Sequence, residues 1–190
     1  IPLLAFGVLI LGLNNCTQPE ETLMYAGSES CRECHERFYQ LWAPSHHGLA
    51  MQGVDSSFIV SELDFSDPSD EIQSFTFTAV VQNDSLIMRE EKDGAVRDYP
   101  AIHALGGKYI YYFLTPFDNG RLQVLPLAYD IKAKQWYNTP ASAVRHFVDP
   151  LEDEELDWHN FAYTFNTSCH SCHVSQLNNN YDMKTGGYLT

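Results

Sequence analysis

Two pentapeptides in this sequence bring together residue types that do covalent and metal chemistry. They are Cys31-Arg32-Glu33-Cys34-His35 and Cys169-His170-Ser171-Cys172-His173. Two thiols three positions apart lie one helical turn from each other, so they can reach the two vinyl groups of one porphyrin, and the adjacent imidazole then falls under the iron. We therefore predict two covalently attached haem c groups. The attachment residues are Cys31, Cys34, Cys169 and Cys172, and the fifth iron ligands are His35 and His173.

Paired cysteines also occur in redox dithiols and in zinc sites. Each pair in this chain is followed at once by a histidine, which neither of those sites requires. A zinc site that unites the four cysteines remains an alternative, although zinc-ligand pairs typically lie closer together in sequence than these two pairs do. The fifth cysteine, Cys16, belongs to neither pair.

The residue at the sixth iron position decides what such a haem does. His46 and His47 follow a predicted helix end, where a turn can aim an imidazole at a second haem. His103 is the next candidate, because the glycines that follow it at 106 and 107 permit close approach of the backbone to a flat ligand. His146 ranks third.

Methionine is the competing ligand, with Met51 near the first motif, and it would raise the reduction potential relative to two histidines. His170 lies between the thiols of its own motif, so we expect it to face solvent or to serve a neighbouring haem. We expect histidine pairs, which leave the iron no open position, and hence electron transfer. The alternative is a multihaem redox enzyme, a reductase or oxidase of a small inorganic substrate, with one haem left open.

The N-terminus carries an apolar run, Ile1 to Leu13, that is too short to cross a bilayer. It is typical of the hydrophobic region of a signal peptide, with a buried core helix as the alternative. Leu13-Asn14-Asn15-Cys16 then resembles a bacterial lipobox, in which Cys16 carries the lipid anchor. We predict a partial, lipoprotein-type signal peptide over 1–15, a tether over 16–24 and a dihaem cytochrome c domain over 25–190. The protein is then exported, to the periplasm or as an outer-membrane lipoprotein.

The two motifs must be positioned by short helices. Ser30 and Glu33 have capping-box spacing, which predicts a helix that starts at the first motif, continues through Trp42 and ends at Pro44. Thr167 or Ser168 is expected to cap the helix that carries the second motif.

Between the motifs, alternating and β-branched residues predict strands. One hairpin joins 74–81 to 85–89 through Asn83-Asp84, a second joins 108–114 to 121–125 through Asp118-Asn119-Gly120, and a short strand follows at 135–137. The predicted fold class is α+β, with short haem-bearing helical segments flanking a small antiparallel β-sheet.

Composition and charge restrict the partners. The 190 residues are 44% hydrophobic, enough to bury a core. Acidic residues number 25 against 11 basic ones, which disfavours nucleic acid and anionic membrane surfaces and favours basic partners. A membrane contact is expected only through the lipid anchor at Cys16.

Several stretches of the chain are similar to one known family. They are 25–35 (YAGSESCRECH), 42–51 (WAPSHHGLAM), 105–108 (LGGK), 120–126 (GRLQVLP) and 165–173 (FNTSCHSCH). They resemble the exported multihaem cytochrome c family that includes the cytochrome c-554-like tetrahaem proteins of ammonia oxidisers, many of whose members carry tetratricopeptide repeats.

The resemblance implies that His47 is a distal ligand to a haem other than the one attached just before it. Relatives continue past the second motif into a third attachment site. We therefore expect this chain to be the N-terminal part of a longer multihaem protein, with a redox partner protein or further haem domains as its partners.

Overall fold

The computed structural model of the chain describes residues 27–142, 155–174 and 179–189. The chain divides into two units, one up to Tyr39 and one from Gln40 onward, and each is considered by itself. The predicted signal peptide over 1–15, the tether over 16–24 with Cys16, and His146 lie outside the described residues.

The first motif lies on two consecutive short helices. The 3₁₀-helix η1 (Ser28–Cys31) leads into α1 (Arg32–Trp42), and the backbone leaves the helical conformation at His35, where φ is −128° and ψ is 41°. The predicted helix is thus confirmed as far as Trp42, but its capping box is not formed. Ser30 already lies inside η1, so its hydroxyl donates a hydrogen bond to the Gly27 carbonyl at 2.8 Å.

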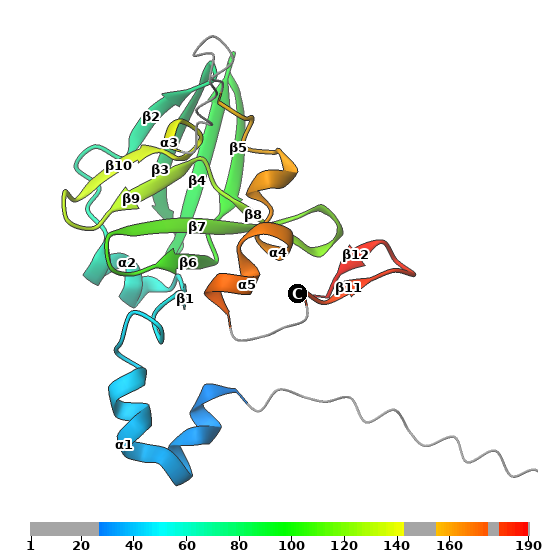
Figure 1. The fold of residues 1–190 in the computed structure, drawn as a ribbon. Coiled ribbons are helices and arrows are strands. Elements are labelled where there is room, and N and C mark those ends of the chain that lie inside the picture. Colours follow the sequence, from blue (N-terminus) through cyan, green and yellow to red (C-terminus); the bar gives the residue numbers. More distant parts are fainter. Residues whose placement is uncertain (1–26, 143–154, 175–178, 190) are drawn as a thin grey trace, which may run out of the picture. The chain divides into compact units, whose positions relative to one another are not determined.

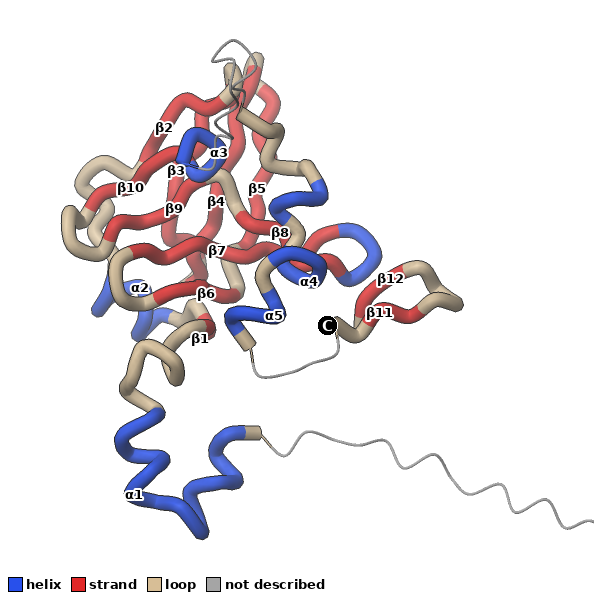
Figure 2. The backbone as a smooth tube through the Cα atoms, viewed as in Figure 1, coloured by secondary structure: helices blue, strands red, loops and turns tan. Residues whose placement is uncertain are grey.

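The second unit is built mainly from β-strands (Figures 1 and 2). Its first part contains β1 (Met51–Gly53), α2 (Ser56–Glu62), β2 (Ser69–Ile72), β3 (Phe75–Gln82), β4 (Ser85–Lys92), β5 (Ala95–Pro100), β6 (His103–Gly106), β7 (Ile110–Phe117) and η2 (Asp118–Gly120). Its second part contains β8 (Arg121–Val124), β9 (Leu127–Asp130), β10 (Gln135–Asn138), α3 (Thr139–Ser142), η4 (Phe161–Tyr163), α4 (Phe165–Ser168), α5 (His170–His173), β11 (Tyr181–Asp182) and β12 (Gly187–Tyr188).

The strands form two larger antiparallel sheets and a small hairpin, not the one small sheet that we predicted. One sheet has the order β2-β3-β4-β5. The other has the order β1-β6-β7-β9-β10, with β8 also paired to β7, and β11 pairs only with β12. The fold is therefore mixed α+β and mostly antiparallel, with few and short helices.

The two predicted hairpins are confirmed in type and position. Asn83 and Asp84 both have positive φ, 49° and 60°, as a tight two-residue turn requires, and Gln82 pairs with Ser85 across it. The β7–β8 connection turns at Asn119, where φ is 58°. The short strand predicted at 135–137 is β10.

β7 separates two apolar clusters because its side chains alternate between the faces of the sheet. Tyr111 and Phe113 point into the core between the two large sheets, together with Phe77 of β3 and Trp136 of β10. Leu114 points the other way. It belongs to a second cluster that also contains Leu105, Leu122, Val124, Tyr163 and Phe165. The second motif follows directly on this second cluster, so the sheet face away from the main core is the face that positions it.

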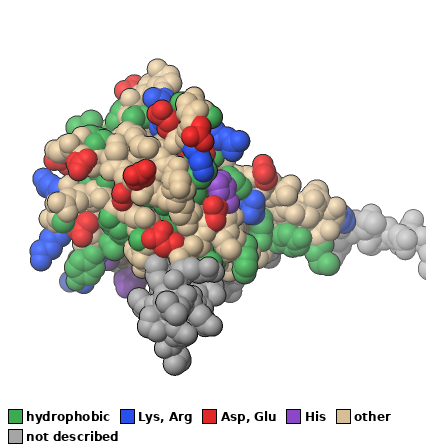
Figure 3. Space-filling model, turned by 90° about the horizontal axis from the view of Figure 1, so that it is seen from above, with side chains coloured by type: hydrophobic (Ala, Val, Ile, Leu, Met, Phe, Trp, Pro, Cys, Tyr) green, Lys and Arg blue, Asp and Glu red, His purple; other side chains and the backbone are tan. Residues whose placement is uncertain are grey.

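The surface of the β-rich unit carries scattered charge. Acidic side chains are spread over the face seen in Figure 3, with a few basic ones between them. In the part of the chain that the structure describes, no helix is long and apolar enough to cross a membrane.

Candidate cofactor site

The first motif is exposed throughout. Cys31, Cys34 and His35 are all solvent-accessible, and both thiols are free. Within the same unit Glu29 accepts hydrogen bonds from the Tyr39 hydroxyl and from Arg32, the latter at 2.9 Å. These two donors, Tyr39 first, hold the pKa of the Glu29 carboxyl below its usual range. The motif is thus presented on a helix whose residues are all outside the protein core.

The second motif forms a single helical turn. The Cys172 and His173 amides both donate to the Cys169 carbonyl at 3.2 Å, which places the two thiols one turn apart as their spacing predicts. Both thiols are free, Cys169 partly buried and Cys172 exposed. Burial, and to a lesser extent the neighbouring Cys172, raises the pKa of the Cys169 thiol.

The predicted cap of this helix is wrong. Cys169 itself occupies the N-cap position of α5, and no side chain caps the turn. Thr167 lies within the preceding turn, α4, where its hydroxyl donates to the Thr164 carbonyl at 3.2 Å. The reason is that α4 and α5 are two consecutive turns, so the polar residues before Cys169 are already helical.

Buried polar residues fasten the second motif to β8, and sequence reasoning missed them. Gln123 is fully buried. Its amide nitrogen donates to the Trp158 and Asn160 carbonyls at 2.6 and 3.0 Å, and its amide oxygen accepts from the Thr164 hydroxyl at 3.0 Å. Asn166 accepts a hydrogen bond of 2.7 Å from the Leu122 amide. These bonds fix the start of α4, and with it the motif that follows.

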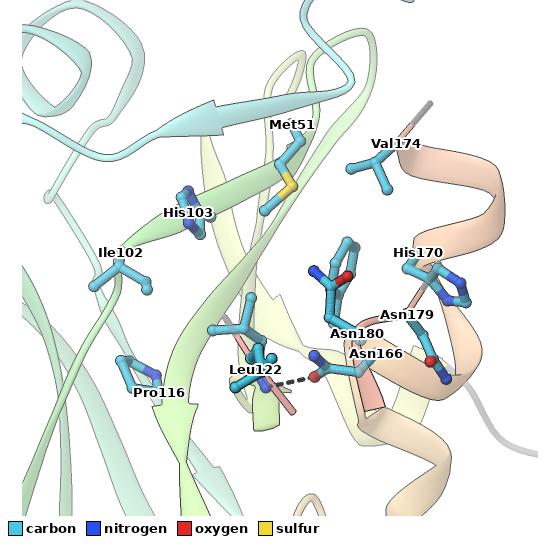
Figure 4. A pocket seen from close by; sticks show the side chains of 12 residues that line it. Met51, Ile102, His103, Pro116, Leu122, Asn166, His170, Val174, Asn179 and Asn180 are labelled. Atoms are coloured by element: carbon cyan, nitrogen blue, oxygen red, sulfur yellow. Dashed lines mark hydrogen bonds between the residues drawn. The ribbon is translucent and has the colours of Figure 1, made fainter. Parts of the chain in front are cut away.

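A cavity of about 440 Å³ lies beside the second motif. One wall is the sheet face that carries Met51 of β1, His103 of β6 and Leu122 of β8, and the facing wall includes His170 and Val174 at the two ends of α5 (Figure 4). The volume is within the range of small-molecule and cofactor sites.

The C-terminal hairpin supplies a third part of the lining, through Asn180 before β11 and Leu189 after β12. The hairpin lies against the β7–β8 turn at Gly120, where φ is +68° and an added Cβ would stand 2.0 Å from the Tyr188 carbonyl oxygen. Only glycine permits this close approach of the turn to the hairpin.

Of the predicted sixth ligands, His103 and the competing Met51 line the same cavity as His170 of the second motif. His103 is half-buried, and burial lowers its pKa, partly offset by a hydrogen bond with the Gln52 backbone. His46 and His47 are exposed in the turn after α1, which Ser45 holds by donating to the Trp42 carbonyl at 2.6 Å, and they do not line the cavity.

The expectation about Gly106 needs correction. We expected the glycines after His103 to permit close approach to a flat ligand. At Gly106 the space is taken by the backbone instead, because an added Cβ would stand 2.1 Å from the Ile110 carbonyl oxygen. His170, which we expected to face solvent or to serve a neighbouring haem, is partly buried and lines the cavity.

The residues present fit a covalently attached haem. The ring Nδ1 atoms of His170 and His173 are buried without a hydrogen-bond partner, so both imidazoles lack the contacts that buried polar atoms normally make. The two thiols of the second motif are free and one turn apart. A largely apolar cavity of cofactor size lies beside the same turn, where His170 and Val174 line it. Within the described ranges, no three His, Cys, Asp or Glu side chains gather so as to hold a metal ion by themselves.

No protein-family model, no curated protein and no solved structure matches this chain.

Proposed function

We propose that the protein is an exported, lipid-anchored multihaem c-type cytochrome that transfers electrons. The observation that carries the proposal is the pair of Cys-x-x-Cys-His motifs, the second of which forms a helical turn with free thiols beside a cavity of about 440 Å³. Each thiol adds its sulfur and its hydrogen across one vinyl double bond of the porphyrin, so nothing leaves in the attachment. Attachment of this kind takes place outside the cytoplasm.

The chain's own residues have separate roles in this function. Cys31, Cys34, Cys169 and Cys172 fix the porphyrins, and His35 and His173 donate ring nitrogens to the iron. A bound haem supplies one-electron chemistry between ferric and ferrous iron. Histidines from elsewhere in the protein, among them His46, His47 and His103, are the candidates to fill the remaining iron positions and so exclude water and substrates. The partners are a redox protein or further haem domains.

Cysteine variants test the attachment. The full chain is exported in cells that carry a c-type cytochrome maturation system, and covalent haem is counted by mass spectrometry of the denatured protein. We expect two haems in the wild type, one in Cys31→Ser/Cys34→Ser, one in Cys169→Ser/Cys172→Ser and none in the fourfold variant. A wild-type chain without covalent haem, in cells that mature a control cytochrome, would refute the proposal.

The same samples separate a carrier from an enzyme. Iron with two protein ligands is six-coordinate and low-spin, and its spectrum does not respond to cyanide, carbon monoxide or nitrite. A high-spin component that shifts when these ligands are added would favour the alternative, a multihaem enzyme with one open haem that acts on a small inorganic molecule.

A further inference from the structure

The sheet wall of the cavity is organised around His103. In the antiparallel pair of β1 and β6, Gly53 stands opposite His103 and Met51 stands opposite Leu105. Residues opposite each other share a face of the sheet, so His103, Met51 and Leu105 all point to the side on which α5 lies. Figure 4 shows His103 and Met51 on this wall, across the cavity from Val174 and His170.

The surroundings of His103 leave space beside its ring. Its cross-strand partner, Gly53, has no side chain, and a Cβ added there would meet no atom within 4 Å. The register of β1 against β6 therefore leaves the ring next to open space, as a flat ligand approaching it would need.

His103 also has the support that metal-binding histidines usually have. The Gln52 backbone lies close enough to the imidazole to raise its pKa. A hydrogen bond from a backbone group to the second ring nitrogen typically fixes the tautomer and orientation of a ligating histidine. Burial favours the neutral ring, which is the form that binds a metal.

Two further side chains on the cavity walls, Met51 and His170, are weaker candidates for the iron. Met51 packs against the second apolar cluster, where a flexible thioether fills space without needing a ligand. His170 stands between the two attachment cysteines of its own motif. The His103 imidazole is a polar group on a largely apolar wall, so it does not fill space there in the way that an apolar side chain does.

We propose that the cavity receives the haem attached at Cys169 and Cys172, and that His103 is the sixth ligand of its iron. The assignment rests on the proposed function, since it presupposes that the second motif carries haem. It gives the β-sheet a role: β6 carries the distal ligand, and β8 holds the segment that carries the proximal one, His173.

The test uses the full chain with Cys31→Ser/Cys34→Ser as the parent, so that only the second motif carries haem. Electron paramagnetic resonance and visible spectra report the ligands of the ferric iron. We expect a low-spin parent, and a high-spin His103→Ala variant that returns to the low-spin state when imidazole is added. His103→Met should stay low-spin, acquire the signature of methionine ligation and have a higher reduction potential.

Two matched variants serve as controls. Met51→Leu changes the other candidate on the same wall, and His159→Ala removes a histidine outside the cavity that pairs with Asp157 at 2.7 Å. Both should remain low-spin with the parent's spectrum.

The assignment is overturned if the parent is high-spin, if His103→Ala and His103→Met keep the parent's spectrum, or if Met51→Leu becomes high-spin. A parent without covalent haem would defeat the proposed function itself, and the two failures are therefore distinguishable.

Discussion

The two Cys-x-x-Cys-His motifs have different surroundings although their cysteines and final histidine have the same spacing. Cys31, Cys34 and His35 are exposed on short helices, whereas Cys169 is partly buried and its thiol pKa is raised by burial. The difference arises because the second motif follows residues that are hydrogen-bonded to β8, and among the described residues of the first unit nothing comparable holds the first motif. The second motif is therefore the one whose position the described fold determines most fully, and the same would hold for a haem attached to it.

Tyr111 provides a pH-dependent test of the core beneath the site. Its hydroxyl donates to Glu62 of α2 at 2.9 Å, and burial, assisted by this carboxylate, raises the pKa of Tyr111 to about 12. Between pH 10 and 12 the unfolded chain loses the phenolic proton while the folded chain keeps it. The free energy of unfolding should therefore fall by up to about 1.4 kcal/mol per pH unit in this window, and Tyr111→Phe should remove this dependence.

Urea unfolding followed by circular dichroism at pH 8 to 12 measures the effect as the difference between wild type and variant. Tyr109→Phe is the matched control, because Tyr109 is 61% exposed and lies two residues away, and it should leave the pH profile unchanged. Parallel profiles for the wild type and Tyr111→Phe would contradict the prediction.

Whether a residue's role could be predicted depended on how far along the chain its partners lie. The helical turn that places Cys169 and Cys172 one turn apart was predictable because the spacing of the motif is local. We predicted His103 as a ligand because of the glycines that follow it, but Gly106 only makes room for the Ile110 carbonyl oxygen. The register of β1 against β6 explains why the His103 side chain lies at the cavity, and the sequence alone does not reveal that register. Gln123 and Asn166 gave no local signal, because their partners lie 35 to 44 residues away.

At the scale of elements, hairpins were predictable and sheets were not. The turns at Asn83-Asp84 and at Asp118–Gly120 carry their signals in adjacent residues. The strands divide into two sheets between β5 and β6, and β1 then joins the second sheet by pairing with β6. β1 and β6 are strands of three and four residues whose partners lie about fifty positions apart. Such short strands show too little alternation to be recognised before the pairing is known.

The link between β8 and α4 can be tested with one substitution. Asn166→Ala removes the acceptor of the Leu122 amide at a site where Asn166 is only 5% exposed. Leaving a buried amide unpaired costs about 1 to 3 kcal/mol, so urea unfolding should show a loss of that size. Hydrogen exchange of the Leu122 amide should accelerate, because α4 no longer protects it.

Asn138→Ala is the matched control for this experiment. The Asn138 side chain likewise accepts a hydrogen bond from a backbone amide, that of Ala141 at 2.8 Å, but at an exposed site where water can replace it. Asn138 directly precedes α3 and caps it, so its loss should cost about 0.5 to 1 kcal/mol, the lower part of the range for a helix cap. Equal destabilisation by the two variants would show that the buried bond to β8 does not fix α4 in the way we describe.

At the scale of the whole molecule, charge is the dominant property. Acidic residues exceed basic ones by 14, and Figure 3 shows no single acidic patch on the face in view. A charge of this size keeps a protein soluble whatever its function, but it also sets up a field that attracts cations over roughly 10 Å at 0.1 M salt. For an electron carrier this field acts on the encounter with its redox partner.

The rate of electron exchange with small reagents should report this field. If the haems of the proposed cytochrome exchange electrons through the acidic surface, reduction by a cationic complex is fast at low salt and slows several-fold as ionic strength rises from about 0.01 to 0.5 M, because the Debye length shortens from roughly 30 Å to a few ångströms. An anionic reductant of matched driving force should show the opposite slope, and a neutral one should show none. Stopped-flow absorbance of the haems measures all three. If the cationic and anionic reagents respond equally to salt, the net charge serves solubility alone, and the exchange surface must lie where acidic and basic groups balance.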